Sequence, residues 1–461
     1  MFKILSVDQA RATLLRRPAP DEITVTEGMR RRTREVFGED LSPEEAVRRI
    51  LLDVRSQGDS ALIAWTQALD RVTLTAAQIA VQRADIAAAY DQVDAAVVVA
   101  LKQAAARIAQ FHARLVAQTW MTTELGGVLG QIVRPLDRVG VYIPGGSAPL
   151  ASTLLMTAIP ARQAGVKEVV VCAPPQPPAS GRLPLPHPVI LVAADIAQVD
   201  AIYAVGGAQA IGAMAYGTST IKRVDKICGP GNAFVVMAKR QVFGICGIDA
   251  LPGPTETVII ADEAANPAWV AADLLAQAEH LGGTALLLTP SRRLAEAVSA
   301  QVGIQLAGLP EPSREAIVES LAHRSGTVLT EDLAEAVALA NEFAPEHLCL
   351  SVSDPWAWVD AIRNAGGVFV GEHSYEVLGD YVAGPSHVMP TGGTARFASP
   401  LSALDFLRVT NIVALDAATA HQIAPAAARL AEAEGLSAHA NAVHQRMRWS
   451  ATRAGDVAHT K

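Results

Sequence analysis

Short apolar runs alternate with longer segments of helical periodicity over most of the chain. A first series of β-rich runs occupies residues 139–143, 168–173, 189–194, 202–206 and 226–229. A second series occupies residues 257–262, 284–290, 326–329, 348–352 and 367–371. Because apolar residues recur every three or four positions between these runs, the sequence predicts βαβ units and parallel sheets.

Helical patterns flank the two series. Apolar spacing predicts helices from about residue 31 to 118, including 43–57 and 59–69. After Pro400 we expect two helices, 417–434 and 436–449, and no further strand. The predicted fold class is therefore α/β, with two αβα (Rossmann-like) layers, mainly parallel sheets, a helical N-terminal region and an extended helical C-terminal tail.

This pattern also predicts a division into domains, as the length of 461 residues favours. We expect an N-terminal segment (1–30), a large α/β domain (31–138 with 255–401), a second α/β domain (139–254) and a helical tail (402–461). The proline-rich stretch 173–188 is expected to form an exposed excursion.

Composition limits the kinds of partner. Hydrophobic residues make up 50% of the chain and charged residues 18%, against roughly 25% charged in an average domain. We therefore expect a large interface between domains or subunits. No apolar run reaches the roughly 18 residues of a membrane span, and residues 1–18 lack a secretory signal pattern, so we predict a cytoplasmic protein. The net charge of −8, with acids and bases interspersed, argues against nucleic-acid and membrane partners.

Candidate chemistry is concentrated in four islands, of which Gly379 to Phe397 is the most informative. Its glycines and prolines predict a loop without regular structure that can turn Asp380 and His387 into a cleft. A helix expected at 267–280 carries Gln277 and His280 on one face.

The other two islands pair a glutamate with a histidine. Glu346 and His347 follow Ala344-Pro345 and can occupy a turn. Glu434 and His439 lie in the predicted tail. Two of the four islands have an ordinary alternative: a surface or capping pair for Gln277 and His280, and solvated charges at the end of a helix or strand for Glu346 and His347.

These islands, together with residues 138–161, 205–218, 224–244 and 248–262 in the same order, resemble the histidinol dehydrogenase family over nearly the whole chain. The resemblance implies a zinc- and NAD-dependent oxidoreductase that converts L-histidinol to L-histidine through L-histidinaldehyde, ending histidine biosynthesis. It also implies a homodimer in which the tail completes the active site of the partner, so that Glu434 and His439 serve the other subunit.

The resemblance further implies roles for individual residues. Gln277, His280, Asp380 and His439 would hold one Zn²⁺ per subunit, a borderline donor set that suits this metal. His347 would take the alcohol proton, and Glu346 would activate the water that hydrates the aldehyde. The implied substrate contacts are Thr255, Gln277, His280, His347, Asp380, His387, Glu434 and His439.

The sequence evidence for a cofactor site is weaker than that for the catalytic residues. No G-x-G-x-x-G opens a helix after a strand, so the usual dinucleotide fingerprint is absent. The sequence GPGN at 229–232 follows an expected strand and begins an expected helix, a setting that can receive phosphate or serve as a plain connection. By resemblance, Tyr142, Gln209 and Asn232 contact NAD.

Three alternatives remain open. A related zinc and NAD dehydrogenase could act on another polar alcohol, although the presence of Glu434 and of Glu346-His347 favours L-histidinol. A zinc hydrolase would use similar residues to activate water but would form no NADH. A structural protein stabilised by metal would turn over no substrate.

Overall fold

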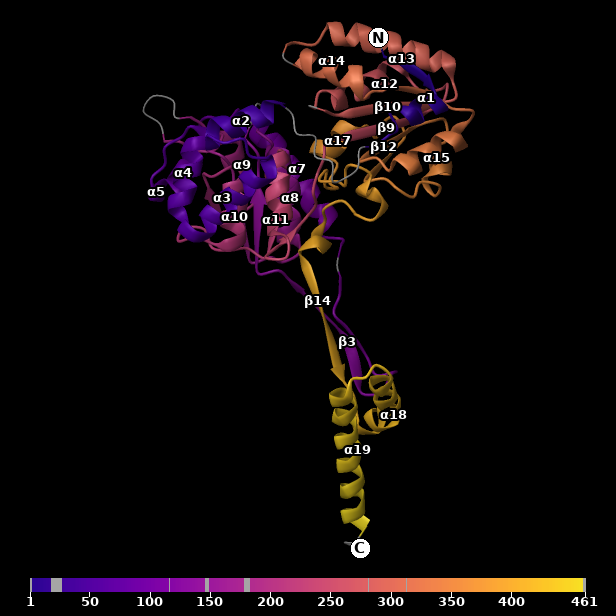
Figure 1. The fold of residues 1–461 in the computed structure, drawn as a ribbon. Coiled ribbons are helices and arrows are strands. Elements are labelled where there is room, and N and C mark those ends of the chain that lie inside the picture. The colour runs from indigo at the N-terminus through magenta and orange to yellow at the C-terminus, as the bar shows by residue number, and fades with distance from the viewer. Residues whose placement is uncertain are drawn as a thin grey trace. The chain divides into compact units, whose positions relative to one another are not determined.

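The computed structural model describes residues 2–17, 27–115, 117–145, 149–177, 183–280, 282–311 and 313–458 (Figure 1). The chain divides into two compact units. The first takes in the described residues of Met1–Val116 and Pro135–Phe406, and the second takes in those of Ala117–Arg134 and Leu407–Lys461. Within these described ranges, no helix is both long enough and apolar enough to cross a membrane.

The first unit contains a five-stranded sheet. Its strands are β4 (Arg138–Tyr142), β5 (Glu168–Cys172), β6 (Ala201–Tyr203), β7 (Lys226–Cys228) and β8 (Gly247–Ile248). They lie in the order β6-β5-β4-β7-β8, and all pairs are parallel. The connecting helices include α8 (Ala151–Gln163), α9 (Pro188–Ile196), α10 (Gly207–Tyr216) and α11 (Ala233–Val242). The strand order reverses at β4, and ligands of such sheets bind at the carboxyl ends of the strands at that point.

Residues 189–194, which were predicted as a strand, form most of helix α9. His187 caps this helix because its Nδ1 accepts a hydrogen bond from the backbone N–H of Val189 (3.2 Å), and Pro188 takes the first helical position. Ile190 to Ala194 are all buried. Because the run is apolar on every side, its periodicity does not distinguish a strand from a helix, and the prediction was wrong.

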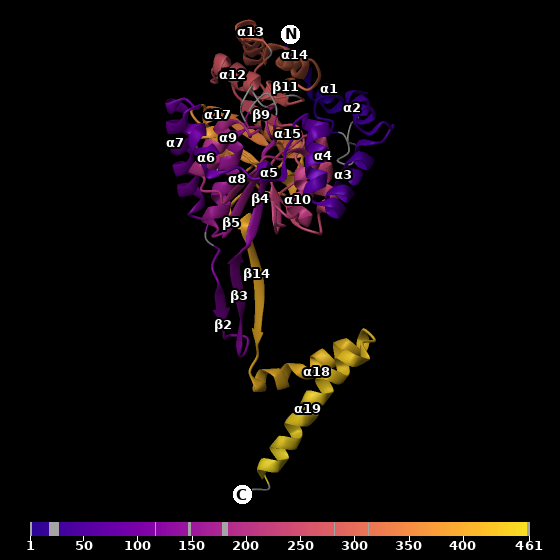
Figure 2. The same ribbon diagram turned by 90° about the vertical axis from the view of Figure 1, so that its left-hand side faces the viewer.

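The predicted N-terminal helices are present. They are α2 (Glu27–Phe37), α3 (Pro43–Gln57), α4 (Asp59–Asp70), α5 (Ala76–Ile79), α6 (Arg83–Tyr90) and α7 (Ala95–His112). Residues of α3 and α4 share a hydrophobic core with residues of α10, and residues of α6 and α7 share one with residues of α8 and α9. Figure 2 shows the ribbons of these helices around strands β4 and β5. The predicted large domain grouped residues 31–138 with residues 255–401. In the structure, helices α3, α4, α6 and α7 share hydrophobic cores with the five-stranded sheet instead. The other domain limits remain a prediction.

A six-stranded parallel sheet forms the rest of the first unit. Its strands are β1 (Ile4–Ser6), β9 (Glu256–Ala261), β10 (Thr284–Thr289), β11 (Gly326–Leu329), β12 (His347–Ser351) and β13 (Gly367–Val370), in the order β1-β11-β10-β9-β12-β13. Its helices are α1 (Val7–Ala12), α12 (Pro267–Ala278), α13 (Arg292–Ala307), α14 (Ser313–His323), α15 (Leu333–Phe343), α16 (Trp356–Val359) and α17 (Glu376–Tyr381). Each of the two parallel sheets has helices packed on both faces through hydrophobic cores, which confirms the predicted fold class.

The second unit contains a small sheet and the C-terminal helices. The sheet has the order β14 (Leu407–Ala414), β3 (Val128–Pro135) and β2 (Trp120–Thr122), and the helices are α18 (Ala417–Ala433) and α19 (Ser437–Ala458). The helical C-terminal region is confirmed, but the expectation of no strand after Pro400 was wrong. Only two residues of β14 are even partly buried, so the strand shows no apolar alternation by which to recognise it.

His112, in the last turn of α7, should make the folded state less stable at acidic pH. Its side chain is 1% exposed and neither ring nitrogen has a hydrogen-bond partner, and burial lowers its pKa to about 4. An unfolded histidine titrates near ~6.5, so between pH 6.5 and 4 the unfolded state binds more protons and stability falls as pH falls.

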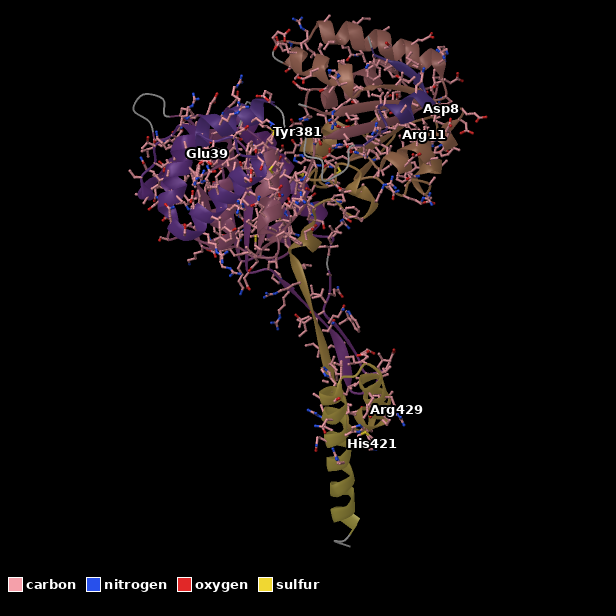
Figure 3. All side chains as sticks on the ribbon, viewed as in Figure 1. Asp8, Arg11, Glu39, Tyr381, His421 and Arg429 are labelled. Atoms are coloured by element: carbon pink, nitrogen blue, oxygen red, sulfur yellow. The ribbon has the colours of Figure 1, made fainter. Side chains whose placement is uncertain are left out.

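We expect His112→Leu to remove this acid sensitivity. The free energy of unfolding of His112→Leu minus that of the parent should increase by about 2 kcal/mol when the pH is lowered from 7 to 4.5. Urea denaturation at both pH values measures the difference. His421→Gln, at an exposed position labelled in Figure 3, is the control and should show no such change. Parallel pH profiles for the parent and His112→Leu would contradict the assignment.

Candidate active site

One cavity in the first unit brings together seven of the predicted site residues. Its volume is about 240 Å³. Residues at the amino ends of β9 and β12 line it, as do Pro230 and Asp249, which follow β7 and β8. The seven predicted residues in its wall are Thr255, Gln277, His280, Glu346, His347, Asp380 and His387.

The pairing of β9 with β12 places Thr255, Glu346 and His347 at one edge of the sheet. The strands are parallel with His347 opposite Thr257, so residues that precede the two strands meet. The carboxylate of Glu346 accepts hydrogen bonds from the hydroxyl of Thr255 (2.5 Å) and the backbone N–H of Glu256 (3.0 Å). Glu346 and His347 are both buried, which excludes the alternative of solvated charges at a strand end.

Helix α12 delivers the next two predicted residues. It ends at Ala278, two residues earlier than predicted, so Gln277 lies in its last turn and His280 just beyond it. Gln277 is buried and His280 is exposed. The amide of Gln277 satisfies its surroundings when its nitrogen donates to Oε1 of Glu376 (2.5 Å) and its oxygen accepts from the backbone N–H of Glu256 (3.1 Å).

Asp380 lies in helix α17. The expectation that Gly379 to Phe397 lacks regular structure was therefore wrong at its start, and also at the short 3-10 helix Thr394–Arg396. Gly379 lets α17 approach β13, because a Cβ there would collide with the ring of Phe369. Tyr381 ends the helix with an exposed side chain (Figure 3).

His387 connects this segment to α8. Its Nδ1 lies 2.6 Å from the backbone oxygen of Asp380, and its Nε2 lies 3.0 Å from the hydroxyl of Thr153. Because a carbonyl oxygen only accepts, Nδ1 donates and Nε2 accepts from the hydroxyl. Burial lowers the pKa of His387, in agreement with a neutral ring. The imidazole is thus held in one tautomer and one orientation.

His347 lies among three carboxylates. Its Nδ1 is 3.6 Å from Glu346 Oε2 and 3.9 Å from Glu376 Oε1, and its Nε2 is 3.3 Å from Asp380 Oδ1. Burial acts to lower the pKa of His347, but the three carboxylates together raise it to about 10. Burial raises the pKa of Glu346 and of Glu376 to about 7. The cluster therefore contains acids that exchange protons near neutral pH.

The same cluster offers ligand atoms for a cation. Atoms of His347, Glu376 and Asp380 lie within 4.8 Å of one another. Burial opposes ionisation of Asp380, but the hydrogen bond and charge of His347 outweigh it and lower the pKa of this carboxyl. An ionised carboxylate beside imidazole nitrogens is the chemistry that divalent transition metals bind.

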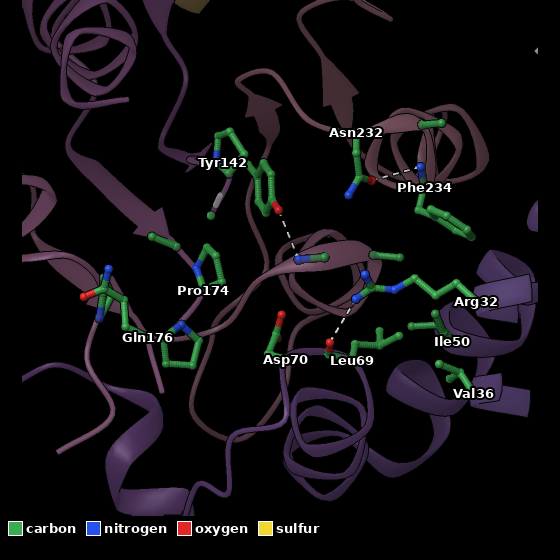
Figure 4. Close-up of a pocket in the computed structure, with 18 of the residues that line it drawn as sticks. Arg32, Val36, Ile50, Leu69, Asp70, Tyr142, Pro174, Gln176, Asn232 and Phe234 are labelled. Carbon is green, nitrogen blue, oxygen red and sulfur yellow. Dashed lines mark hydrogen bonds between the residues drawn. The ribbon is translucent and has the colours of Figure 1, made fainter. Parts of the chain in front are cut away.

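A larger cavity of about 730 Å³ lies at the carboxyl edge of the five-stranded sheet (Figure 4). Tyr142 ends β4 and Asn232 follows β7, so both line the cavity where the strand order reverses. The hydroxyl of Tyr142 accepts from the backbone N–H of Gly207 (3.1 Å), and Oδ1 of Asn232 accepts from that of Phe234 (3.0 Å). This is the position at which sheets of this topology bind ligands.

Gln209 lies behind this wall rather than in it. It is fully buried, and its Nε2 is 3.5 Å from Oδ2 of Asp70, which does line the cavity. The proline-rich stretch contributes to the wall through Pro174, Pro175, Pro177 and Pro186. Residues 178–182 of the expected excursion lie outside the described residues.

Glu434 and His439 belong to the second unit. Glu434 follows the end of α18, His439 lies in the first turn of α19, and both side chains are exposed. Neither is among the residues that line the two cavities. The first unit of one chain thus gathers seven of the predicted site residues, and these two are not among them.

Known proteins with similar sequences decide the family. The family model for histidinol dehydrogenase matches residues 34–447. Histidinol dehydrogenase of Deinococcus radiodurans is 51% identical over 447 residues, which cover 97% of this chain and 100% of that protein. The chain belongs to the histidinol dehydrogenase family.

Other members of the histidinol dehydrogenase family agree in sequence and in fold. The Thermus thermophilus protein is 50% identical over 408 residues, covering 88% of this chain and 95% of its own. A crystal structure of histidinol dehydrogenase from Elizabethkingia anophelis has a TM-score of 0.85 at 35% identity and covers 97% of each chain. The resemblance found in the sequence is confirmed, and it makes the protein an oxidoreductase of histidine biosynthesis.

Glu376 is the one member of the buried cluster that sequence analysis did not select. It is 2% exposed and lies four residues before Asp380, a spacing that puts both carboxylates on one helix face. That spacing was available in the sequence. It had no meaning while a loop was expected to begin at Gly379, because only a continuous helix fixes the side chain of residue 376 relative to that of residue 380.

Proposed function

We propose that this protein catalyses the NAD-dependent four-electron oxidation of L-histidinol to L-histidine through L-histidinaldehyde, the last steps of histidine biosynthesis. One observation carries the proposal: a single cavity in which the buried pair Glu346 and His347 meets Gln277, His280 and Asp380. Two candidate bases beside three candidate ligand donors suit a reaction that removes protons in two successive steps from a substrate held in place.

Gln277, His280 and Asp380 would hold one Zn²⁺ per subunit, with His439 of the partner subunit as the fourth ligand. The donors fit this metal, because they combine imidazole nitrogen, amide oxygen and a carboxylate whose lowered pKa keeps it ionised. When bound, zinc would serve as a template that holds the imidazole and amino nitrogens of the substrate.

The proposal includes a homodimer in which the tail of each chain completes the site of its partner, as the family resemblance implies. Glu434 and His439 are exposed on the second unit, and the first unit of the same chain presents the other site residues in one cavity. The proposal therefore assigns the partner subunit's Glu434 to the substrate and the partner subunit's His439 to the metal. Thr255 and His387, both in the cavity wall, complete the substrate contacts.

His347 would accept the alcohol proton, and Glu346 would activate the water that hydrates the aldehyde. Because burial raises the pKa of Glu346 to about 7, this group can alternate between carboxylate and carboxyl at neutral pH. His347 must first be neutral, and its pKa of about 10 reflects the charge of the surrounding carboxylates. A cation held by Asp380 would compensate one of these charges and favour the neutral imidazole.

The larger cavity would bind NAD, with Tyr142 and Asn232 in its wall and Gln209 behind it. NAD would accept a hydride in each of the two oxidations. The sequence 229–232 supports this placement, because Pro230 lines the smaller cavity and Asn232 lines the larger one. One short turn therefore borders both the proposed cofactor site and the proposed substrate site.

The substrate can be tested by comparing two amino alcohols. With zinc and NAD, we expect kcat/KM for L-histidinol to exceed that for L-leucinol, which lacks the imidazole, by at least ~100-fold. NADH absorbance measures both rates. A value for L-leucinol equal to or above that for L-histidinol would favour a dehydrogenase for another polar alcohol.

A further inference from the structure

Arg17, which follows α1, contacts the turn that leads into the catalytic pair. Its Nε donates to the backbone oxygen of Phe343 (2.9 Å), and its second terminal nitrogen donates to the same oxygen (2.7 Å) and to that of Ala344 (3.4 Å). The guanidinium carbon lies 3.8 Å from the centre of the Phe343 ring. Two kinds of contact, hydrogen bonds and a cation–π contact, therefore fix one guanidinium against the end of α15.

The same guanidinium forms a two-pronged ion pair with Glu256. Both carboxylate oxygens of Glu256 accept from Arg17, one of them at 2.9 Å. The side chain of Glu256 is 8% exposed and that of Arg17 is 22% exposed, so the pair is largely shielded from water. Paired forks of this kind set geometry as well as energy, because both planar groups must align.

Glu256 in turn contacts both proposed bases through its backbone. Its N–H donates to Oε2 of Glu346 (3.0 Å), and its carbonyl oxygen lies 3.2 Å from Nδ1 of His347. Neither Arg17 nor Glu256 lines the cavity. Arg17 therefore contacts Glu256 and residues 343–344 from outside the cavity. These segments in turn position Glu346 and His347, which line the cavity.

The turn that Arg17 contacts includes a residue, Ala344, with an unfavourable backbone conformation. Ala344 adopts the left-handed conformation (φ 52°, ψ 65°), which is unfavourable for a residue with a Cβ. Such a conformation persists only where the surroundings enforce it. Arg17 supplies that enforcement directly, since it donates to the carbonyl oxygens of the two peptide groups that flank the Cα of Ala344.

We propose that Arg17 is a positioning residue that sets Glu346 and His347 for reaction through Glu256 and the 343–345 turn. The assignment rests on the proposed function for the catalytic roles of that pair. Arg17 lies outside residues 34–447, over which the family model matches, and comes from the N-terminal segment that adds β1 to the six-stranded sheet.

The test compares Arg17→Ala with Arg17→Lys and with Arg11→Ala as matched control. Arg11 lies on the same segment and pairs with Glu342, next to Phe343, but both of those side chains are more than half exposed (Arg11 is labelled in Figure 3). We expect Arg17→Ala to lower kcat by about 100-fold while KM for L-histidinol changes less than ~3-fold, since the bases move and the ligand donors stay. Arg17→Lys should be intermediate, because one ammonium cannot replace the fork.

Hydrogen exchange separates positioning from stability and from the choice of substrate. In Arg17→Ala, exchange should accelerate at the amide of Ala344, which donates to Ala340 at the end of α15, and at those of Gly366 and Gly367, which donate to Pro345 and Glu346. It should not accelerate in Arg11→Ala. Low concentrations of guanidinium ion should partly restore kcat. A lowered melting temperature with unchanged kcat and unchanged local exchange would overturn the proposal. If the parent does not oxidise L-histidinol, the proposed function fails, and the local exchange alone then decides whether Arg17 positions the pair.

Discussion

His280→Ala is expected to lose bound zinc and NADH-forming activity together while keeping its fold. His280 is exposed just beyond the end of α12, so its removal leaves no cavity in the core. Loss of one of four donors should weaken zinc binding by ~100-fold or more. Metal content after gel filtration, with far-ultraviolet circular dichroism as the fold control, measures this. Zinc retained at full occupancy would remove His280 from the ligand set.

His439→Ala should have the same effect, although its position lies in the other unit of the chain. His444→Ala is the matched control, because His444 is on the same helix and pairs only with Glu432 among the described contacts. Mixing subunits of His280→Ala and His439→Ala tests whether the site is shared. After random exchange, half of the dimers carry one intact site, so about a quarter of the parent activity should return. No recovery would argue against a shared site.

Glu346→Gln is expected to separate the two oxidations. The amide keeps the size of the side chain and its oxygen can still accept from the backbone N–H of Glu256, but it cannot take a proton. Oxidation of L-histidinol should slow by less than ~10-fold and oxidation of L-histidinaldehyde by ~100-fold or more, the usual contribution of a general base. Single-turnover kinetics with each substrate measures the two rates.

The control for this variant is Glu342→Gln, at an exposed acid on the helix that precedes the pair. It should leave both half-reactions unchanged. Equal losses in the two half-reactions of Glu346→Gln would contradict the division of labour between Glu346 and His347. A loss confined to alcohol oxidation would reverse the two roles.

Burial on both faces explains which strands the sequence could predict. Strands β9, β10 and β12 are buried at every position and appear as continuous apolar runs. Residues 189–194 have the same property and form a helix, because the cap at His187 decides the conformation and the run itself does not. Strand β14 is exposed along most of its length, and its pairing with β3 depends on residues far away in the chain.

The site was predictable as a set of residues but not as a geometry. Resemblance to the family selected the seven residues that line the smaller cavity. The short helix α17 was not expected, so the buried Glu376 was missed, and nothing local in the sequence shows that Arg17 lies against Phe343. Contacts between segments some 240 to 330 residues apart depend on the packed sheet rather than on local pattern.

The most direct test of the account is the number of NADH molecules formed per L-histidinol consumed. Purified protein, zinc and excess NAD are mixed with a limiting amount of L-histidinol, and the final absorbance of NADH is read against the L-histidine formed. The account predicts two NADH and one L-histidine per L-histidinol. One NADH with L-histidinaldehyde as product would contradict the four-electron reaction, and no NADH would contradict the proposed substrate.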